Sequence, residues 1–195
     1  MRNSRTFWRT TKSGVVLRLA GIFLSTALMT AQNAPPHYHS TCCYPLPPKK
    51  MQKIPPEIRA QLTEEKCLIP QNPNVIDDPQ PNNAIHGSWA AKGQDDWAVL
   101  CLKPDELSVR IFWGGKISCD DRIVIGKFTP NDSHWDDPET FLWAAPPQTI
   151  RAYNDAFGGR KLPVLDHSGL EVGGGEGSMV YYCRQGEWMK FLGND

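Results

Sequence analysis

Short apolar runs and alternating apolar and polar positions dominate the second half of the chain. Residues 97–102 form an apolar run, and residues 108–113 form another after a short polar connection. In the second run Val109, Ile111 and Trp113 share one face, which is the period of two of a half-buried strand. The two runs therefore predict an antiparallel hairpin.

Three further segments have strand character, and they cover residues 122–126, 179–183 and 187–191. The last two flank an Arg-Gln-Gly connection, in which Gly186 can supply the positive φ of a tight turn. We expect a second hairpin there, and a flexible connection into it through the glycine-rich residues 173–177.

Two segments show helical spacing. Pro55-Pro56 suits an initial helical turn, and the following residues to about Glu65 place Ile58 and Leu62 one turn apart. Residues 148–157 repeat this spacing and end at a Gly-Gly pair. With the predicted strands, these segments indicate an α+β fold, mainly antiparallel β-sheet with one or two short helices, in a single disulfide-stabilised domain.

The first 31 residues differ from the rest of the chain. They contain five basic residues, no acidic residue, and an uncharged stretch of thirteen residues that begins at Leu19. This is the layout of a secretory signal peptide. A retained membrane anchor is the alternative, although Arg18 interrupts the apolar stretch and a spanning helix needs about 20 residues.

Proline-rich sequence follows the predicted signal peptide and favours extended, solvated backbone. We therefore expect a signal peptide over 1–31, a flexible linker over 32–54 and a single α+β domain over 55–195. After cleavage, the protein would be periplasmic or extracellular and would not contact the membrane.

The predicted compartment determines how the six cysteines are interpreted. Oxidising conditions favour disulfides over metal or redox chemistry, although six cysteines allow 15 pairings. We favour a bond from Cys67 to Cys101 and one from Cys119 to Cys183, because these four residues lie in the predicted domain.

The other two cysteines, Cys42 and Cys43, are adjacent in the linker. They can bond each other or a cysteine of another chain. With His37 and His39 they also combine thiolate and imidazole groups, which suits zinc or copper.

Charge is unevenly distributed along the sequence. The chain has 21 basic and 21 acidic residues, and removal of the first 31 leaves 16 basic against 21 acidic, a net charge of −5. Phosphate backbones are bound by basic faces, so the composition argues against nucleic acid as a partner.

Asp166, His167 and Ser168 have the three side-chain types of a hydrolytic triad, but they are immediate neighbours. A triad needs its base between the acid and the nucleophile, and we expect consecutive side chains to point apart. Asp166, Ser168 and Glu171 could instead form an oxygen-rich turn that holds calcium. An ordinary turn with side chains bonded to local backbone is the simpler interpretation.

Tryptophans and acidic residues provide the other candidates for ligand binding. Trp89 and Trp135 lie in polar segments, where exposed tryptophans often mark ligand surfaces. Trp135 precedes Asp136 and Asp137, and carboxylates beside an aromatic ring are typical of sugar-binding faces and glycosidases. Paired carboxylates for a hydrolase could come from a set of five: Asp120, Asp121, Asp136, Asp137 and Glu139.

The sequence from Gly87 through Trp89 to Asp96-Trp97 resembles one unit of the FG-GAP type of β-propeller repeat. In that family, acidic residues of the loop bind calcium, but here Ala90, Ala91 and Lys92 occupy the loop. Further copies are not evident in the sequence, so the resemblance implies neither calcium binding nor a complete propeller.

Over residues 54–195 the chain is similar to a group of exported bacterial proteins of unassigned activity. Three motifs carry the resemblance: Cys67-Leu-Ile-Pro-Gln, Asp96-Trp-Ala-Val-Leu-Cys101 and Asp166-His-Ser-Gly-Leu-Glu171. The resemblance implies export and favours Cys67 and Cys101 as partners.

These features predict an exported, non-catalytic binding or interaction module of the cell envelope or extracellular space, with no cofactor. The alternative is a small secreted hydrolase that acts on polysaccharide or peptide through paired carboxylates.

Overall fold

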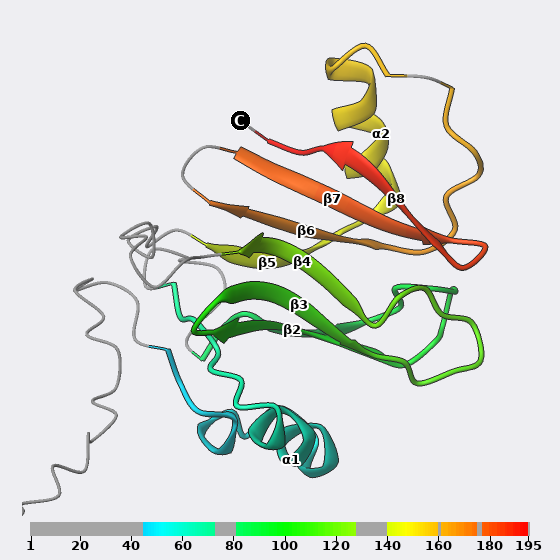
Figure 1. Ribbon diagram of the computed structural model, residues 1–195. Helices are drawn as coiled ribbons and strands as arrows, with labels where there is room; N and C mark the ends of the chain where they lie inside the picture. Colours follow the sequence, from blue (N-terminus) through cyan, green and yellow to red (C-terminus); the bar gives the residue numbers. More distant parts are fainter. Residues whose placement is uncertain (1–44, 73–80, 128–139, 160, 175–176, 195) are drawn as a thin grey trace, which may run out of the picture. The chain divides into compact units, whose positions relative to one another are not determined.

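Two antiparallel sheets form the centre of the computed structural model, which describes residues 45–72, 81–127, 140–159, 161–174 and 177–194 (Figure 1). Each has four strands, and the strand order in each sheet follows the sequence. The first sheet contains β1 (Ala84–Gly87), β2 (Asp96–Lys103), β3 (Glu106–Phe112) and β4 (Arg122–Lys127). The second contains β5 (Phe141–Ala145), β6 (Gly169–Gly174), β7 (Gly177–Arg184) and β8 (Glu187–Leu192).

The two sheets face each other across a shared apolar interior. Buried side chains of both sheets make up this cluster: Trp89, Ala98, Leu100, Leu102, Leu107, Val109, Ile111, Ile123, Leu142, Leu170, Val172 and Tyr181. Asn83 also joins the sheets, because its side chain donates to the Thr140 backbone oxygen (3.1 Å) and accepts from the Leu142 backbone NH (2.9 Å).

A helix covers the outer face of each sheet (Figure 1). Helix α1 (Pro56–Glu64) contributes Ile58 and Leu62 to a cluster that includes Val99 of β2. Helix α2 (Pro147–Ala156) contributes Ile150 to a cluster with Val180 and Tyr182 of β7 and other residues. No helix in the described part of the chain is long and apolar enough to cross a membrane.

The predicted fold class is confirmed, as are both helices, both hairpins and the strand at 122–126. In the second hairpin Gln185 and Gly186 both have positive φ (53° and 86°), as a type I′ turn requires. The expectation that the strand at 108–113 is half-buried is wrong: β3 is buried on both faces over nearly its whole length, because α1 covers the face opposite the interior.

The structure contains elements that the pattern did not predict. Residues 45–54, expected in the flexible linker, include the 3-10 helix η1 (Pro48–Lys50), and Met51 and Ile54 are fully buried beside α1. Residues 169–174 form a strand rather than a turn and flexible glycine-rich connection, because β5 and β7 pair with both of its edges. Strands β1 and β5 were not predicted either.

Both favoured disulfides are present, Cys67 to Cys101 and Cys119 to Cys183. The first lies in the cluster under α1, and the second lies between the sheets. Disulfides of this kind are typical of proteins that fold in oxidising compartments. Cys42 and Cys43 lie outside the described residues, as do His37 and His39.

Glu65, the residue directly after α1, forms ion pairs with Lys103 of β2 and Arg110 of β3 on the outer face of the first sheet. Its carboxylate lies 2.9 Å from Arg110 Nη2 and 3.4 Å from Lys103 Nζ. Burial alone would raise the pKa of Glu65, but the charges of Arg110 and Lys103 and the Gln61 hydrogen bond together lower it. The ion pairs therefore fasten α1 to β2 and β3.

We expect Glu65→Gln to lower the free energy of unfolding at pH 7 by about 2 kcal/mol, because Arg110 would lose the closer of its two charged partners. A carboxyl with a lowered native pKa stabilises the fold above its unfolded value, here 4.5, and stops doing so as pH falls through the native pKa. Urea unfolding at pH 7 and pH 3 should show a difference between variant and wild type that shrinks at pH 3. An equal difference at both pH values would contradict this role.

Candidate functional site

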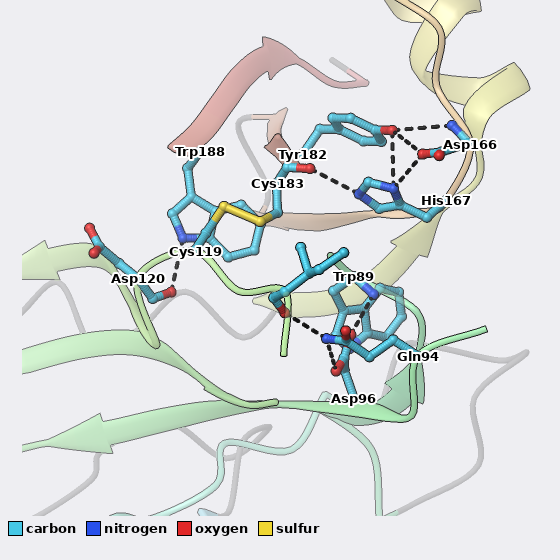
Figure 2. The surroundings of a disulfide bond; sticks show 11 residues. Trp89, Gln94, Asp96, Cys119, Asp120, Asp166, His167, Tyr182, Cys183 and Trp188 are labelled. Carbon is cyan, nitrogen blue, oxygen red and sulfur yellow. Dashed lines mark hydrogen bonds and ion pairs between the residues drawn. A yellow bond between two sulfur atoms is a disulfide. The ribbon is translucent and has the colours of Figure 1, made fainter. Parts of the chain in front are cut away.

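The Cys119–Cys183 disulfide joins the segment before β4 to the end of β7 (Figure 2). Beside it, Trp188 Nε1 of β8 donates to the Asp120 backbone oxygen (3.0 Å). The Trp188 ring also stacks on Trp113, with centroids 5.9 Å apart. A covalent bond, a hydrogen bond and a ring contact thus hold the two sheets together at this junction.

His167 lies beside Cys183 of the disulfide, buried and hydrogen-bonded through both ring nitrogens (Figure 2). Its Nδ1 lies 2.8 Å from Asp166 Oδ1, and its Nε2 lies 3.0 Å from the Cys183 backbone oxygen. Tyr182 stacks on the imidazole (centroids 4.2 Å apart) and donates from its hydroxyl to Asp166 Oδ1 (3.1 Å). The hydrogen bonds from His167 and Tyr182, in that order, lower the pKa of Asp166.

This arrangement corrects the expectation that neighbouring side chains at 166–168 point apart, because Asp166 and His167 bond each other. His167 Nε2 faces the Cys183 backbone oxygen and not a serine hydroxyl, so residues 166–168 do not have the geometry of a hydrolytic triad. The cluster ties the segment before β6 to the end of β7, next to the disulfide.

The residues of the predicted oxygen-rich turn do not come together in the structure. Asp166 bonds His167 and Tyr182, whereas Glu171 lies within β6 and bonds side chains of α2 and β7. Ser168 is half-buried at the start of β6. Among the described residues, no group of three or more His, Cys, Asp and Glu side chains is arranged to hold a metal ion.

Trp89 is 1% exposed and belongs to the interior between the sheets, so the expectation that it is an exposed tryptophan in a polar segment is wrong. Its backbone NH donates to Oδ2 of Asp96 (2.9 Å), which is fully buried. Oδ1 of Asp96 accepts from Gln94 Nε2 (2.8 Å) and from the Gly114 backbone NH (2.9 Å). One carboxylate therefore organises the loop between β1 and β2 and turns Trp89 inward (Figure 2).

The outer face of the second sheet carries another buried carboxylate, that of Glu171, which is 4% exposed. Its Oε1 accepts from Ser178 Oγ of β7 (2.6 Å) and Tyr153 Oη of α2 (3.3 Å). Burial, and then the charge of Glu171, raise the pKa of Tyr153, so its phenol keeps its proton at neutral pH.

An aromatic pair on the edge strand β5 lies next to Glu171 in the sheet. Trp143 is directly opposite Glu171 in the register, and Phe141 is opposite Gly173. The rings of Phe141 and Trp143 stack with centroids 4.2 Å apart, and Trp143 is 40% exposed. A Cβ at residue 173 would lie 2.5 Å from Phe141 Cζ, so glycine there makes room for the Phe141 ring.

Sequence reasoning did not identify this pair. The available signal was the alternation Phe141-Leu142-Trp143, which places two aromatic side chains on one face and a leucine on the other. Leu142 is fully buried in the interior, and the two aromatic side chains lie on the opposite face.

Trp135 lies outside the described residues, as do three of the five predicted carboxylates, Asp136, Asp137 and Glu139. Of the other two, Asp120 contributes its backbone oxygen to the disulfide junction, and Asp121 Oδ1 lies 3.6 Å from Arg110 Nη1 in an ion pair. The paired-carboxylate hydrolase stays a prediction.

Comparisons of the chain with protein-family models, curated proteins and solved structures found no match.

Proposed function

We propose that the protein is an exported, non-catalytic binding module of the cell envelope or extracellular space. We further propose that it binds its ligand on the outer face of the second sheet, beside α2. This β5 surface consists of five residues: Phe141, Trp143, Tyr153, Glu171 and Ser178. The observation that carries the proposal is the exposed Trp143 ring, held in place by Phe141 and placed next to a buried, hydrogen-bonded carboxylate.

A preformed aromatic ring suits binding, because an ordered side chain loses little conformational entropy when a ligand covers it. Exposed aromatic surface with a few fixed polar groups is also the usual make-up of ligand sites. The two disulfides and the predicted signal peptide support the exported location.

The location can be tested by expression of the full chain, cell fractionation and thiol labelling without reductant. We expect the protein in the periplasmic or extracellular fraction, with Cys67, Cys101, Cys119 and Cys183 protected from the reagent. A cytosolic protein whose four thiols react would refute export.

Binding can be tested by co-sedimentation of the exported protein with washed cell-envelope fragments. We expect saturable binding that Trp143→Ala weakens about tenfold or more, because the largest exposed contact would be lost. Ile117→Ala is the matched control, since Ile117 is an exposed apolar side chain in the segment between β3 and β4. Failure of the wild type to bind would contradict the proposed function.

A further inference from the structure

We infer that the β5 surface binds an uncharged glycan, with a sugar ring stacked on Trp143 and sugar hydroxyls hydrogen-bonded to Tyr153 and Ser178. This inference rests on the proposed function and names the class of its ligand. It combines two neighbouring features of the outer face of the second sheet. One is the exposed Trp143 ring, and the other is the pair of hydroxyls of Tyr153 and Ser178.

The apolar observation is the orientation and support of Trp143. Sugar rings have faces made of C–H groups, which pack against the flat faces of aromatic side chains. Trp143 has the exposure for such a contact, and the stack on Phe141, which itself lies over Gly173, restricts its motion. A large, rigid aromatic side chain provides contact area at low entropic cost.

The polar feature is the pair of hydroxyl groups near this ring, whose protons both point toward Glu171. The hydroxyls of Tyr153 and Ser178 both donate to Glu171, so Tyr153 Oη and one remaining lone pair of Ser178 Oγ can accept other hydrogen bonds. Ser178 Oγ already accepts from the Asn194 backbone NH (2.8 Å). A ligand that stacks on Trp143 and supplies O–H donors to these oxygens fits the arrangement, and a sugar has both properties.

Charge narrows the class of glycan. An acidic residue, Glu171, bonds both hydroxyls, and residues 32–195 have 16 basic against 21 acidic side chains. An anionic ligand would be repelled at this position. We therefore expect uncharged sugars to bind more tightly than uronic acid polymers. Glu171 acts here as a positioning residue, since it orients the two hydroxyls from below.

The test uses the exported protein and three probes, cellohexaose, chitohexaose and hexagalacturonate, with binding measured by calorimetry and tryptophan fluorescence. We expect at least one uncharged hexasaccharide to bind and hexagalacturonate to bind more weakly. Trp143→Ala should weaken binding about tenfold or more, whereas Trp143→Phe, which keeps a ring, should weaken it about threefold.

The polar half of the site has its own variants. Tyr153→Phe removes one acceptor and should weaken binding about fivefold, with the fold retained by near-UV circular dichroism. Glu171→Gln keeps the size of the side chain but can present NH₂ to the two hydroxyls, which would turn their protons outward. It should therefore change the preference among the hexasaccharides and not only the affinity.

Three outcomes would overturn the inference or the proposal on which it rests. If neither uncharged hexasaccharide binds at concentrations up to about 10 mM, but Trp143 is still needed for envelope binding, the ligand is not one of these glycans and the inference fails, whereas the proposed binding module stands. If sugar binding is unchanged in Trp143→Ala, the site is wrong. If envelope fragments are not bound at all, the proposed function itself fails.

Discussion

Replacement of Cys119 and Cys183 together by alanine should lower the free energy of unfolding by about 4 kcal/mol. The bond joins residues separated by 64 positions, so it removes many conformations from the unfolded chain. It also lies where Trp188 and Trp113 stack across the two sheets. The measurement is urea unfolding without reductant, followed by tryptophan fluorescence.

The Cys67→Ala/Cys101→Ala variant is the matched control. Its bond closes a shorter loop, with a separation of 34, so the loop-closure contribution should be smaller by about 0.5 kcal/mol. This second bond joins the segment after α1 to β2 and does not cross the interior between the sheets. If the Cys119/Cys183 variant unfolds at the same urea concentration as wild type, the bond does not constrain the chain as proposed.

Local sequence patterns predicted the elements that have strong strand propensity or clear turn residues of their own. Strands β2, β3, β7 and β8 have runs of β-branched, aromatic and leucine residues, and the turn at Gln185-Gly186 closes a hairpin between neighbours in sequence. Both disulfide pairs were also predicted, because the four cysteines lie in the predicted domain and the resemblance to exported proteins favours Cys67 with Cys101.

The missed strands depend on partners that are distant in sequence. Strand β6 contains three glycines and one glutamate in six residues, which is a poor strand by propensity. It is a strand because β5 pairs with one edge and β7 with the other, and because Leu170 and Val172 enter the interior. The buried position of Glu171 follows from this pairing and from α2, so no local pattern could indicate it.

The same limit applies to the candidate site. Trp89 was expected to be exposed because its neighbours in sequence are polar, but those polar residues bond each other and leave the ring inside. Trp143 was not selected, although it is the tryptophan with large exposure in the described part of the chain. Exposure of an aromatic side chain depends on which strand forms the edge of a sheet, and this requires the complete topology.

Asp96→Ala should be as damaging as loss of the disulfide, with a decrease in unfolding free energy of about 4 kcal/mol. Asp96 is fully buried, and its carboxylate is the acceptor for the Trp89 NH, the Gly114 NH and the Gln94 side chain. Removal of this acceptor leaves buried donors unpaired, which costs more than the hydrogen bonds contribute in water. Near-UV circular dichroism should also change, because Trp89 would lose its anchor.

The neighbouring residue provides a matched control for this prediction. Asp95 is also acidic, but its side chain is 77% exposed and pairs with His86 at the surface, so Asp95→Ala should change stability by about 0.5 kcal/mol or less. Asp96→Asn should fall between the two, since its oxygen can still accept from Gln94 and Gly114 while its NH₂ group faces the Trp89 NH. Equal effects of Asp95→Ala and Asp96→Ala would mean that local charge, and not the buried hydrogen bonds, holds the loop. The order Asp96→Ala, Asp96→Asn, Asp95→Ala, from most to least damaging, would mean that the buried hydrogen bonds of this carboxylate hold Trp89 in the interior.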